Sequence, residues 1–220
     1  MVKIFALPAN EGDFIWICYG ENEVYSHILI DGGTKDCGEE YASIIRIIDE
    51  RKEKIEALVL THVDYDHIQG AIEGICRTSD DLLKRTVKKI YFNTCRGIRK
   101  NLKEMGEFLE GSDCVEDQIC VNQNYKQYSV GDGIKFLDLL SEKGLKDRLV
   151  DYVVYGEQAV LPNDAIIRFI SPGEKELIKF ANHWEKYERE NEYVQYASNL
   201  DMVKENLADL MNENLVSDQS

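Results

Sequence analysis

A short polar loop between a buried strand and a helix constrains this chain more than any other stretch. The segment LTHVDYDHIQG, residues 60–70, ends the apolar run IEALVL and leads into the helix-like pattern IQGAIEGIC. It places His62, Asp64, Asp66 and His67 within six residues, although the whole chain has four histidines. Imidazole nitrogens and carboxylate oxygens are typical ligands of divalent cations. The loop therefore predicts a metal site at the end of a buried strand.

The local geometry of the loop favours one or two cations. In an extended chain, the side chains of His62 and Asp64 point to the same side, and Asp66 and His67 follow as the chain turns into a helix. Two cations held in this way lower the pKa of a water molecule and polarise a substrate oxygen. The alternative is a polar surface loop with incidental histidines, but the adjoining buried strand and helix favour the metal site.

Alternating secondary-structure patterns predict the fold class. The segments KIFAL, DFIWICYG and VYSHILI are rich in β-branched and aromatic residues. IEALVL is a short, nearly continuous apolar run typical of a buried strand, and KKIYFN also favours a strand. Between them, the segment EEYASIIRIIDERKEK has helical spacing of its apolar residues Tyr41, Ile44, Ile45 and Ile48. Strands that alternate with helices predict a layered α/β core.

Patterns in the remainder of the chain are weaker. RKNLKEMGEFLEG and GIKFLDLLSEKGLKDRL favour helices, and DYVVYG, QAVL and AIIRFI favour strands. A helix is expected to start near Ser171, with a buried stripe of Leu177, Ala181 and Trp184. A C-terminal helix is expected to present Leu200, Val203, Leu207 and Leu210. We expect one domain over residues 1–220, with a motif-bearing core (1–93), a helical insertion (94–150) and C-terminal strands and helices (151–220).

Composition narrows the classes of partner and location. The net charge of −15 argues against binding nucleic acid through general charge attraction. No apolar run is long enough to cross a membrane, and the first residues show no cleavage-site pattern, so we expect a cytoplasmic protein without a membrane partner. The six cysteines form no Cys-x-x-Cys pair and are expected to be reduced thiols; they are Cys18, Cys37, Cys76, Cys95, Cys114 and Cys120.

Three segments together resemble a known superfamily. THVDYDHIQG is similar to the His-x-His-x-Asp-His signature of the metallo-β-lactamase-fold hydrolases, and HILIDGG ends in the Asp31-Gly32-Gly33 step that precedes this signature. EGDFIWI, with its Gly12-Asp13 step, resembles the first strand of one branch. That branch includes hydrolase domains of DNA-uptake channel proteins and hydrolases of bacterial anti-phage defence systems. The resemblance covers about residues 1–93.

The resemblance implies a fold, an activity and roles for individual residues. The fold is an αββα sandwich, and the activity is metal-dependent hydrolysis of a phosphodiester or nucleotide-type substrate. His62, Asp64, Asp66 and His67 would hold one or two divalent ions (Zn, Mn or Fe). Asp66 would also be catalytic, because it would orient the attacking water or accept its proton, and Asp31 would brace the metal loop without binding the ion.

The chain departs from the pattern of the superfamily at several ligand positions. Asp64 stands where the signature has its second histidine, and this harder ligand favours Mn, Mg or Fe over Zn. After His67 the chain has only His183, which lies in a helix-like segment and is expected to be structural. His27 shares the strand parity of Asp31 but is expected in the core or on the surface. Asp132 follows polar residues and is not expected to bridge two ions.

The second half of the sandwich is not recognisable in the sequence. We therefore expect the chain to be the N-terminal part of a longer protein, with an apolar sheet face that needs the missing C-terminal half or a second copy, as in a homodimer. The competing hypothesis is a non-catalytic interaction module that keeps the scaffold and docks partners through the apolar face of residues 200–215. A third, an ordinary α/β protein with an accidental motif, does not account for the joint presence of both motifs.

Overall fold

A six-stranded sheet forms the centre of the part of the molecule that carries the motifs. The computed structural model describes residues 1–21, 24–104 and 123–191. The chain divides into two compact units, residues 1–181 and 182–220, and the sheet lies in the first. The strands of the sheet are β1 (Val2–Ala6), β2 (Phe14–Glu21), β3 (Val24–Asp31), β4 (Lys54–Val59), β5 (Ile90–Tyr91) and β6 (Leu149–Val150).

The order of the strands brings three chain segments to one edge of the sheet. The strands run β1-β2-β3-β4-β5-β6, with antiparallel pairing from β1 to β3 and parallel pairing from β3 to β6. Phe14 at the start of β2 pairs with Asp31 at the end of β3, and Ile30 pairs with Val59 at the end of β4. The residues just before β2 and just after β3 and β4 therefore meet, and all three motifs fall there.

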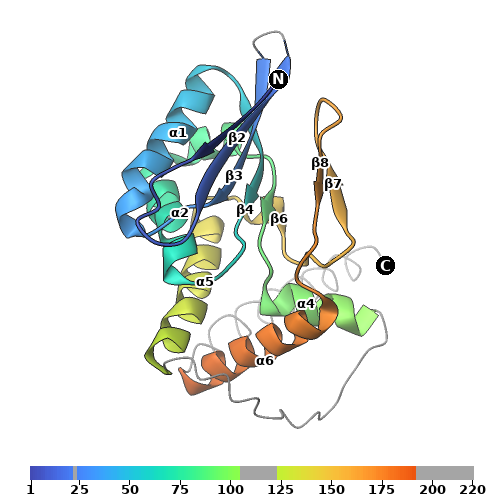
Figure 1. Cartoon of the computed structure of the whole chain (residues 1–220). Helices are drawn as coiled ribbons and strands as arrows, with labels where there is room; N and C mark the ends of the chain where they lie inside the picture. The colour runs from blue at the N-terminus through green and yellow to red at the C-terminus, as the bar shows by residue number, and fades with distance from the viewer. Residues whose placement is uncertain (22–23, 105–122, 192–220) are drawn as a thin grey trace, which may run out of the picture. The chain divides into compact units, whose positions relative to one another are not determined.

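Helices cover one face of the sheet (Figure 1). These helices are α1 (Gly38–Glu50), α2 (Tyr65–Arg77), α3 (Asp80–Thr86) and α5 (Gln123–Glu142), and a one-turn 3₁₀ segment η1 (Lys35–Cys37) precedes α1. The predicted apolar stripe of α1 is confirmed, because all four of its residues are buried: Tyr41, Ile44, Ile45 and Ile48. Leu29 and Leu58 on the sheet are fully buried. Burial of each such side chain stabilises the folded state by about 1.5–3 kcal/mol relative to its exposure to water.

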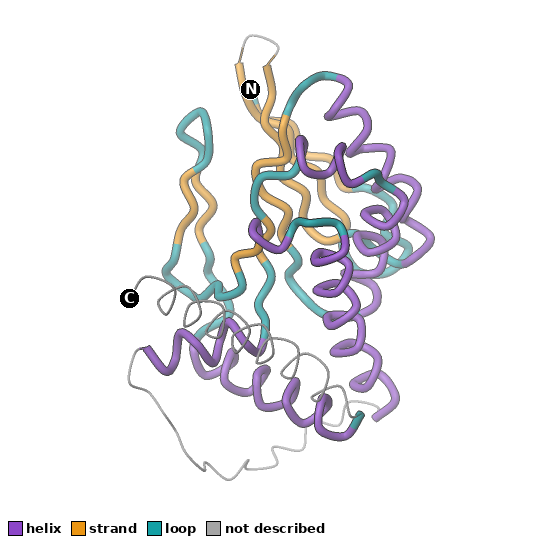
Figure 2. The backbone as a smooth tube through the Cα atoms, turned by 180° about the vertical axis from the view of Figure 1, so that it is seen from behind, coloured by secondary structure: helices purple, strands orange, loops and turns teal. Residues whose placement is uncertain are grey.

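A two-stranded hairpin packs against the opposite face of the sheet. Figure 2, which shows the backbone from behind, has the hairpin on one side of the sheet and the helices on the other. Its strands are β7 (Gln158–Val160) and β8 (Ile166–Arg168). The core between the hairpin and the sheet is formed by buried Tyr19, Ile28, Ala57, Tyr91, Val153 and Leu161. Alternation along the hairpin turns Ala159 and Ile167 towards this core and leaves Val160 and Ile166 exposed. The arrangement confirms the predicted α/β class, with a small second sheet.

The structure differs from the sequence-based expectations in three places. The predicted strand at residues 151–156 is wrong, because the short strand β6 ends one residue earlier. Helix α3 was not predicted; its Arg85 pairs with Asp49 of α1 at 2.7 Å. Helix α5 begins at Gln123, ten residues before the predicted start, although Gly131 and Gly133 lie within it. In α5 the side chain of Asp132 is paired with Lys135.

The remaining elements are α4 (Cys95–Glu104), a second 3₁₀ segment η2 (Lys146–Arg148) and α6 (Glu174–Glu190), which starts in the first unit and ends in the second. The predicted stripe of α6 is confirmed by burial of Leu177, Ala181 and Trp184. The expected C-terminal leucine face, Cys114 and Cys120 lie outside the described residues. Across the described part of the chain, no helix is both long and apolar enough to cross a membrane.

Candidate metal centre

The buried carboxylate of Asp31 organises the sheet edge where the motifs meet. Asp31 ends β3 with a left-handed backbone (φ +54°), a conformation that Asp tolerates better than most residues, and its side chain is 1% exposed. Its two oxygens accept hydrogen bonds from the backbone N–H of Thr61 at 2.7 Å and from the Thr61 hydroxyl. A third bond joins Asp31 Oδ2 to Nδ1 of His67 at 2.9 Å. Asp31 thus ties Thr61, two residues after the end of β4, to the first turn of α2.

The bond to Asp31 fixes how His67 presents its ring. An ionised carboxylate only accepts hydrogen bonds, so Nδ1 of His67 must carry the proton. Nε2 is then the nitrogen left to offer a lone pair, and it lies on the side of Asp66, 3.8 Å from Asp66 Oδ2. A histidine oriented by a carboxylate on its far nitrogen is a recurrent arrangement at metal sites.

The four predicted ligands are not equally close together. The rings of His62 and His67 are adjacent, with centroids 5.0 Å apart, and Asp66 lies beside His67. Asp64 occupies the position before α2, where its backbone carbonyl accepts the N–H of His67 at 3.0 Å. The side chain of Asp64 is exposed, and among the described residues no hydrogen bond or ion pair joins it to the other three. Three of the four predicted ligands therefore share one neighbourhood.

A further acidic residue reaches the same place from the loop before β2. Asp13, Asp31 and His67 each offer a ligand atom, and these three atoms lie within 4.8 Å of one another. The sequence motifs placed Asp13 at the start of a strand and indicated no role for it at the site. Its role follows from the structure, in which Asp13 directly precedes a strand whose first residue pairs with Asp31.

Close backbone contacts lock this edge together. A Cβ atom built on Gly70 would lie 1.8 Å from the carbonyl oxygen of Gly32, so α2 can approach the Asp-Gly-Gly turn only because both positions lack side chains. Two hydrogen bonds cross the same contact, from Gly32 N–H to His67 O at 2.8 Å and from Gly70 N–H to Gly33 O at 3.0 Å. The position of His67 is therefore set by backbone atoms.

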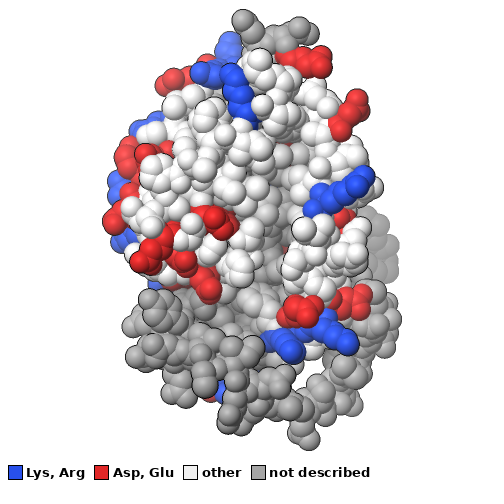
Figure 3. Space-filling model, in the orientation of Figure 1, with Lys and Arg blue, Asp and Glu red and all other residues white. Residues whose placement is uncertain are grey.

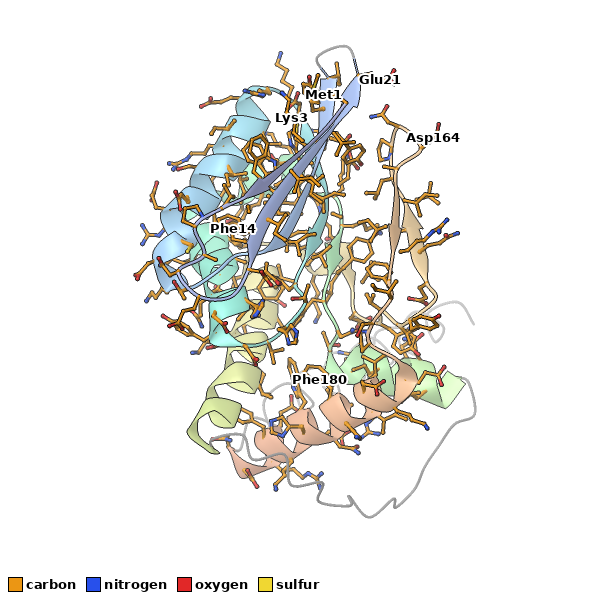
Figure 4. The ribbon with its side chains drawn as sticks, viewed as in Figure 1. Met1, Lys3, Phe14, Glu21, Asp164 and Phe180 are labelled. Atoms are coloured by element: carbon orange, nitrogen blue, oxygen red, sulfur yellow. The ribbon has the colours of Figure 1, made fainter. Side chains whose placement is uncertain are left out.

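The electrostatics of the site differ from those of an ordinary histidine. Burial lowers the pKa of His67, but the hydrogen bond to Asp31 and the charges of Asp31, Asp66 and Asp13 outweigh this effect, and the net pKa is raised. Figures 3 and 4, drawn in the same orientation, show acidic side chains gathered near the start of β2, where Phe14 is labelled. This part of the surface carries negative charge that a bound cation would neutralise.

The other two histidines have different settings. His27 is fully buried; its Nδ1 accepts a hydrogen bond from Trp16 Nε1 at 3.0 Å, and its Nε2 lies 2.8 Å from Glu53 Oε2. Of the two places expected for His27, the core and the surface, the structure shows the core. His183 lies on the part of α6 that belongs to the second unit, and its side chain is exposed rather than part of a core.

The residues present fit a divalent cation. Two atoms that each lie about 2.1 Å from one cation are at most about 4.2 Å apart, and the separation of His67 Nε2 and Asp66 Oδ2 meets this condition. Nitrogen and carboxylate oxygen together suit Zn, Mn or Fe. Asp31 is better placed to orient His67 than to bind the ion, because three hydrogen bonds already occupy its oxygens.

Comparison with known proteins points in the same direction. No protein-family model matches the chain. A protein named hydroxyacylglutathione hydrolase from Psychromonas ingrahamii is 26% identical over 101 residues, which cover 46% of this chain and 36% of that protein. The match thus spans little more than a third of the relative, which is a member of the metallo-β-lactamase superfamily. The similarity supports this superfamily, and with it the α/β fold class, for the chain.

Proposed function

We propose that the protein is a metal-dependent hydrolase. One observation carries the proposal: buried Asp31 fixes His67 so that its second nitrogen faces Asp66 at a distance that suits a shared cation. Similarity to a hydrolase of the metallo-β-lactamase superfamily supports the reaction class. A divalent cation in this place supplies positive charge that lowers the pKa of water and polarises the bond to be cleaved.

The residues of the chain have distinct roles in this proposal. His62, Asp64, Asp66 and His67 hold the metal, and Asp31 keeps the ring of His67 in the tautomer that binds it. Asp66 also orients the attacking water or accepts its proton, because its carboxylate is partly exposed beside His67. Asp64 can take part because it lies within the same loop and its exposed side chain is free to rotate.

The proposed substrate is a phosphodiester or a nucleotide. The resemblance of the Gly12-Asp13 strand and of the Asp64 variant to one branch of the superfamily supports this class. An acidic protein needs bound cations to accept a phosphate group, and the candidate site offers the ligands for them. A hydroxyacylglutathione thioester, named by the relative, is the second substrate class to be compared.

The experiment measures hydrolysis of bis(4-nitrophenyl) phosphate and of a hydroxyacylglutathione thioester with Mn²⁺ and with Zn²⁺. Asp66→Ala and His67→Ala are expected to lower metal-dependent hydrolysis by about 100-fold or more. Asp164→Ala, at the exposed tip of the β7–β8 hairpin, is the control and should keep full activity (Figure 4). Full activity in both site variants would overturn the assignment. Cleavage of the thioester alone would keep the hydrolase and replace the substrate class.

A non-catalytic module is the second candidate, and the ligand inventory favours it. Within residues 1–181 the structure describes three histidines, and His27 has both ring nitrogens engaged away from the site. A site with so few imidazoles can have lost its metal. Elemental analysis of protein purified without chelator separates the two candidates, because a metal-free, stable protein that gains no metal on dialysis against Mn²⁺ or Zn²⁺ supports the module.

A further inference from the structure

Asp13 has the features of an unused ligand at the sheet edge. Its carboxylate is exposed, and no hydrogen bond or ion pair joins it to any residue in the described ranges. A carboxylate oxygen of Asp13 nonetheless lies within 4.8 Å of ligand atoms of His67 and Asp31. The oxygens of Asp31 are occupied by Thr61 and His67. Of these two aspartates, Asp13 is therefore the one that can turn towards a cation.

The backbone holds Asp13 at this position from two sides. Its carbonyl accepts the N–H of Gly33 at 2.9 Å, which fastens it to the Asp-Gly-Gly turn. On the other side, Gly12 has φ +72°, and a Cβ built there would lie 2.1 Å from the carbonyl oxygen of Asp66. The Gly12-Asp13 step thus packs directly on the metal loop, which places the exposed Asp13 side chain beside His67.

The first unit offers few imidazole ligands, so a cation bound there needs carboxylate ligands as well. His62 and His67 are the imidazoles that the described part of this unit can offer, since His27 is engaged by Trp16 and Glu53. Further ligands must then come from oxygen donors. A cation that reaches the site beside three carboxylates, those of Asp13, Asp31 and Asp66, gains from each negative charge.

We infer that Asp13 is a direct ligand of the cation held by His67 and Asp66, an inference that rests on the proposed function. The chain thereby replaces an imidazole by a carboxylate that comes from the loop before β2. The resulting site is rich in oxygen, so Asp13 contributes more to binding of Mn²⁺ than of Zn²⁺, because harder cations gain more from a carboxylate.

The test measures Mn²⁺ binding by the whole chain, with the electron paramagnetic resonance signal of free Mn²⁺ as the readout and with no substrate present. Asp13→Asn removes the charge and keeps the size of the side chain. We expect it to weaken Mn²⁺ binding at least about tenfold and to weaken Zn²⁺ binding less. Asp164→Asn is the matched control and should bind Mn²⁺ like the unsubstituted protein. Asp13→Glu, which keeps the carboxylate, should recover part of the affinity.

Each outcome decides between the inference and the proposed function. If the unsubstituted protein binds Mn²⁺ and Asp13→Asn binds it equally well, the inference is overturned and the proposed function stands. If the unsubstituted protein and Asp164→Asn bind neither Mn²⁺ nor Zn²⁺, both fail together. Thermal unfolding without metal shows whether the variants fold alike; if Asp13→Asn does not, Asp13→Glu decides through the rise in Tm that Mn²⁺ produces.

Discussion

Two histidine–carboxylate pairs share strand β3 but have opposite surroundings. His27 lies within the strand and pairs with Glu53, whereas Asp31 ends the strand and pairs with His67. Both pairs join a ring nitrogen to a carboxylate at less than 3 Å. In the first pair both residues are buried, and in the second the histidine is partly exposed.

The second ring nitrogen distinguishes the two pairs. Trp16 N–H can only donate, so Nδ1 of His27 must accept, and Nε2 must then donate to Glu53. Both nitrogens of this ring are hydrogen-bonded, and the ring is part of the core. In His67 the nitrogen that does not face Asp31 is turned towards Asp66. A histidine–carboxylate contact therefore does not by itself indicate a metal site; the partner of the other nitrogen decides.

The largest expected effect on stability comes from breaking the buried pair. Glu53→Ala removes the partner of His27 and also the acceptor of the Tyr25 backbone N–H at 3.1 Å. One buried donor, His27 Nε2, and one partly buried donor, the Tyr25 N–H, lose their partner, and we expect a loss of about 3 kcal/mol in the free energy of unfolding. Urea denaturation measures this loss, with exposed Glu50→Ala as the control. A loss below that of the control would show that the pair is dispensable, whereas Mn²⁺ affinity should not change.

A smaller effect is expected from weakening the pair at the site. Asp31→Asn keeps a residue type that tolerates a positive φ, so the backbone is not strained, but it removes the charge that holds His67 in its metal-binding tautomer. We expect metal affinity to fall by about 10- to 100-fold. Isothermal titration with Mn²⁺ and Zn²⁺ checks this. Unchanged affinity would mean that the hydrogen bond to His67 does not prepare it for metal.

The smallest effect is a pair of opposite pKa shifts in metal-free protein. Burial lowers the pKa of His27, although the contact with Glu53 opposes it, whereas the pKa of His67 is raised. His27 thus costs stability as the pH falls below its unfolded value, because only the unfolded chain takes up the proton. The contribution of His67 is complete below its unfolded value and is lost as the pH rises through the folded one.

Nuclear magnetic resonance of the ring Cε1–H groups, with chelator present, measures these values directly. The signal of His67, assigned by its absence in His67→Gln, should titrate above the ordinary value of 6.5, and that of His27 below it. Titration of both rings at the same pH would remove the distinction between the two pairs.

The sequence predicts the frame of the molecule better than the details of its site. β-Branched and aromatic runs identify β2 and β3, a nearly continuous apolar run identifies β4, and helical patterns identify α1 and α2. Asp31 and the His62–His67 loop could be found from their order along the chain. The role of Asp13 could not, because it depends on the pairing of β2 with β3, which brings the residue before one strand beside the residue that ends the next.

The same limit explains the elements that the sequence misplaces. The polar start of α5 hides a helix whose Val130 and Asp132 are buried, so tertiary contacts override its glycines. The two-residue strands β5 and β6 are too short for any periodic pattern to set their ends. His27 could be placed on the correct face of its strand, but its partners Trp16 and Glu53 depend on strand register and on where α1 ends.

The contact between Gly32 and Gly70 separates the scaffold of the site from its chemistry. Two main-chain hydrogen bonds fasten the Gly32-Gly33 turn to α2, so exchanging His62, Asp64 or Asp66 leaves them untouched. Such a chain can change its preferred ion by single substitutions and keep the same backbone. A redesign towards zinc would begin with Asp64→His, which leaves the contact between Gly32 and Gly70 unchanged.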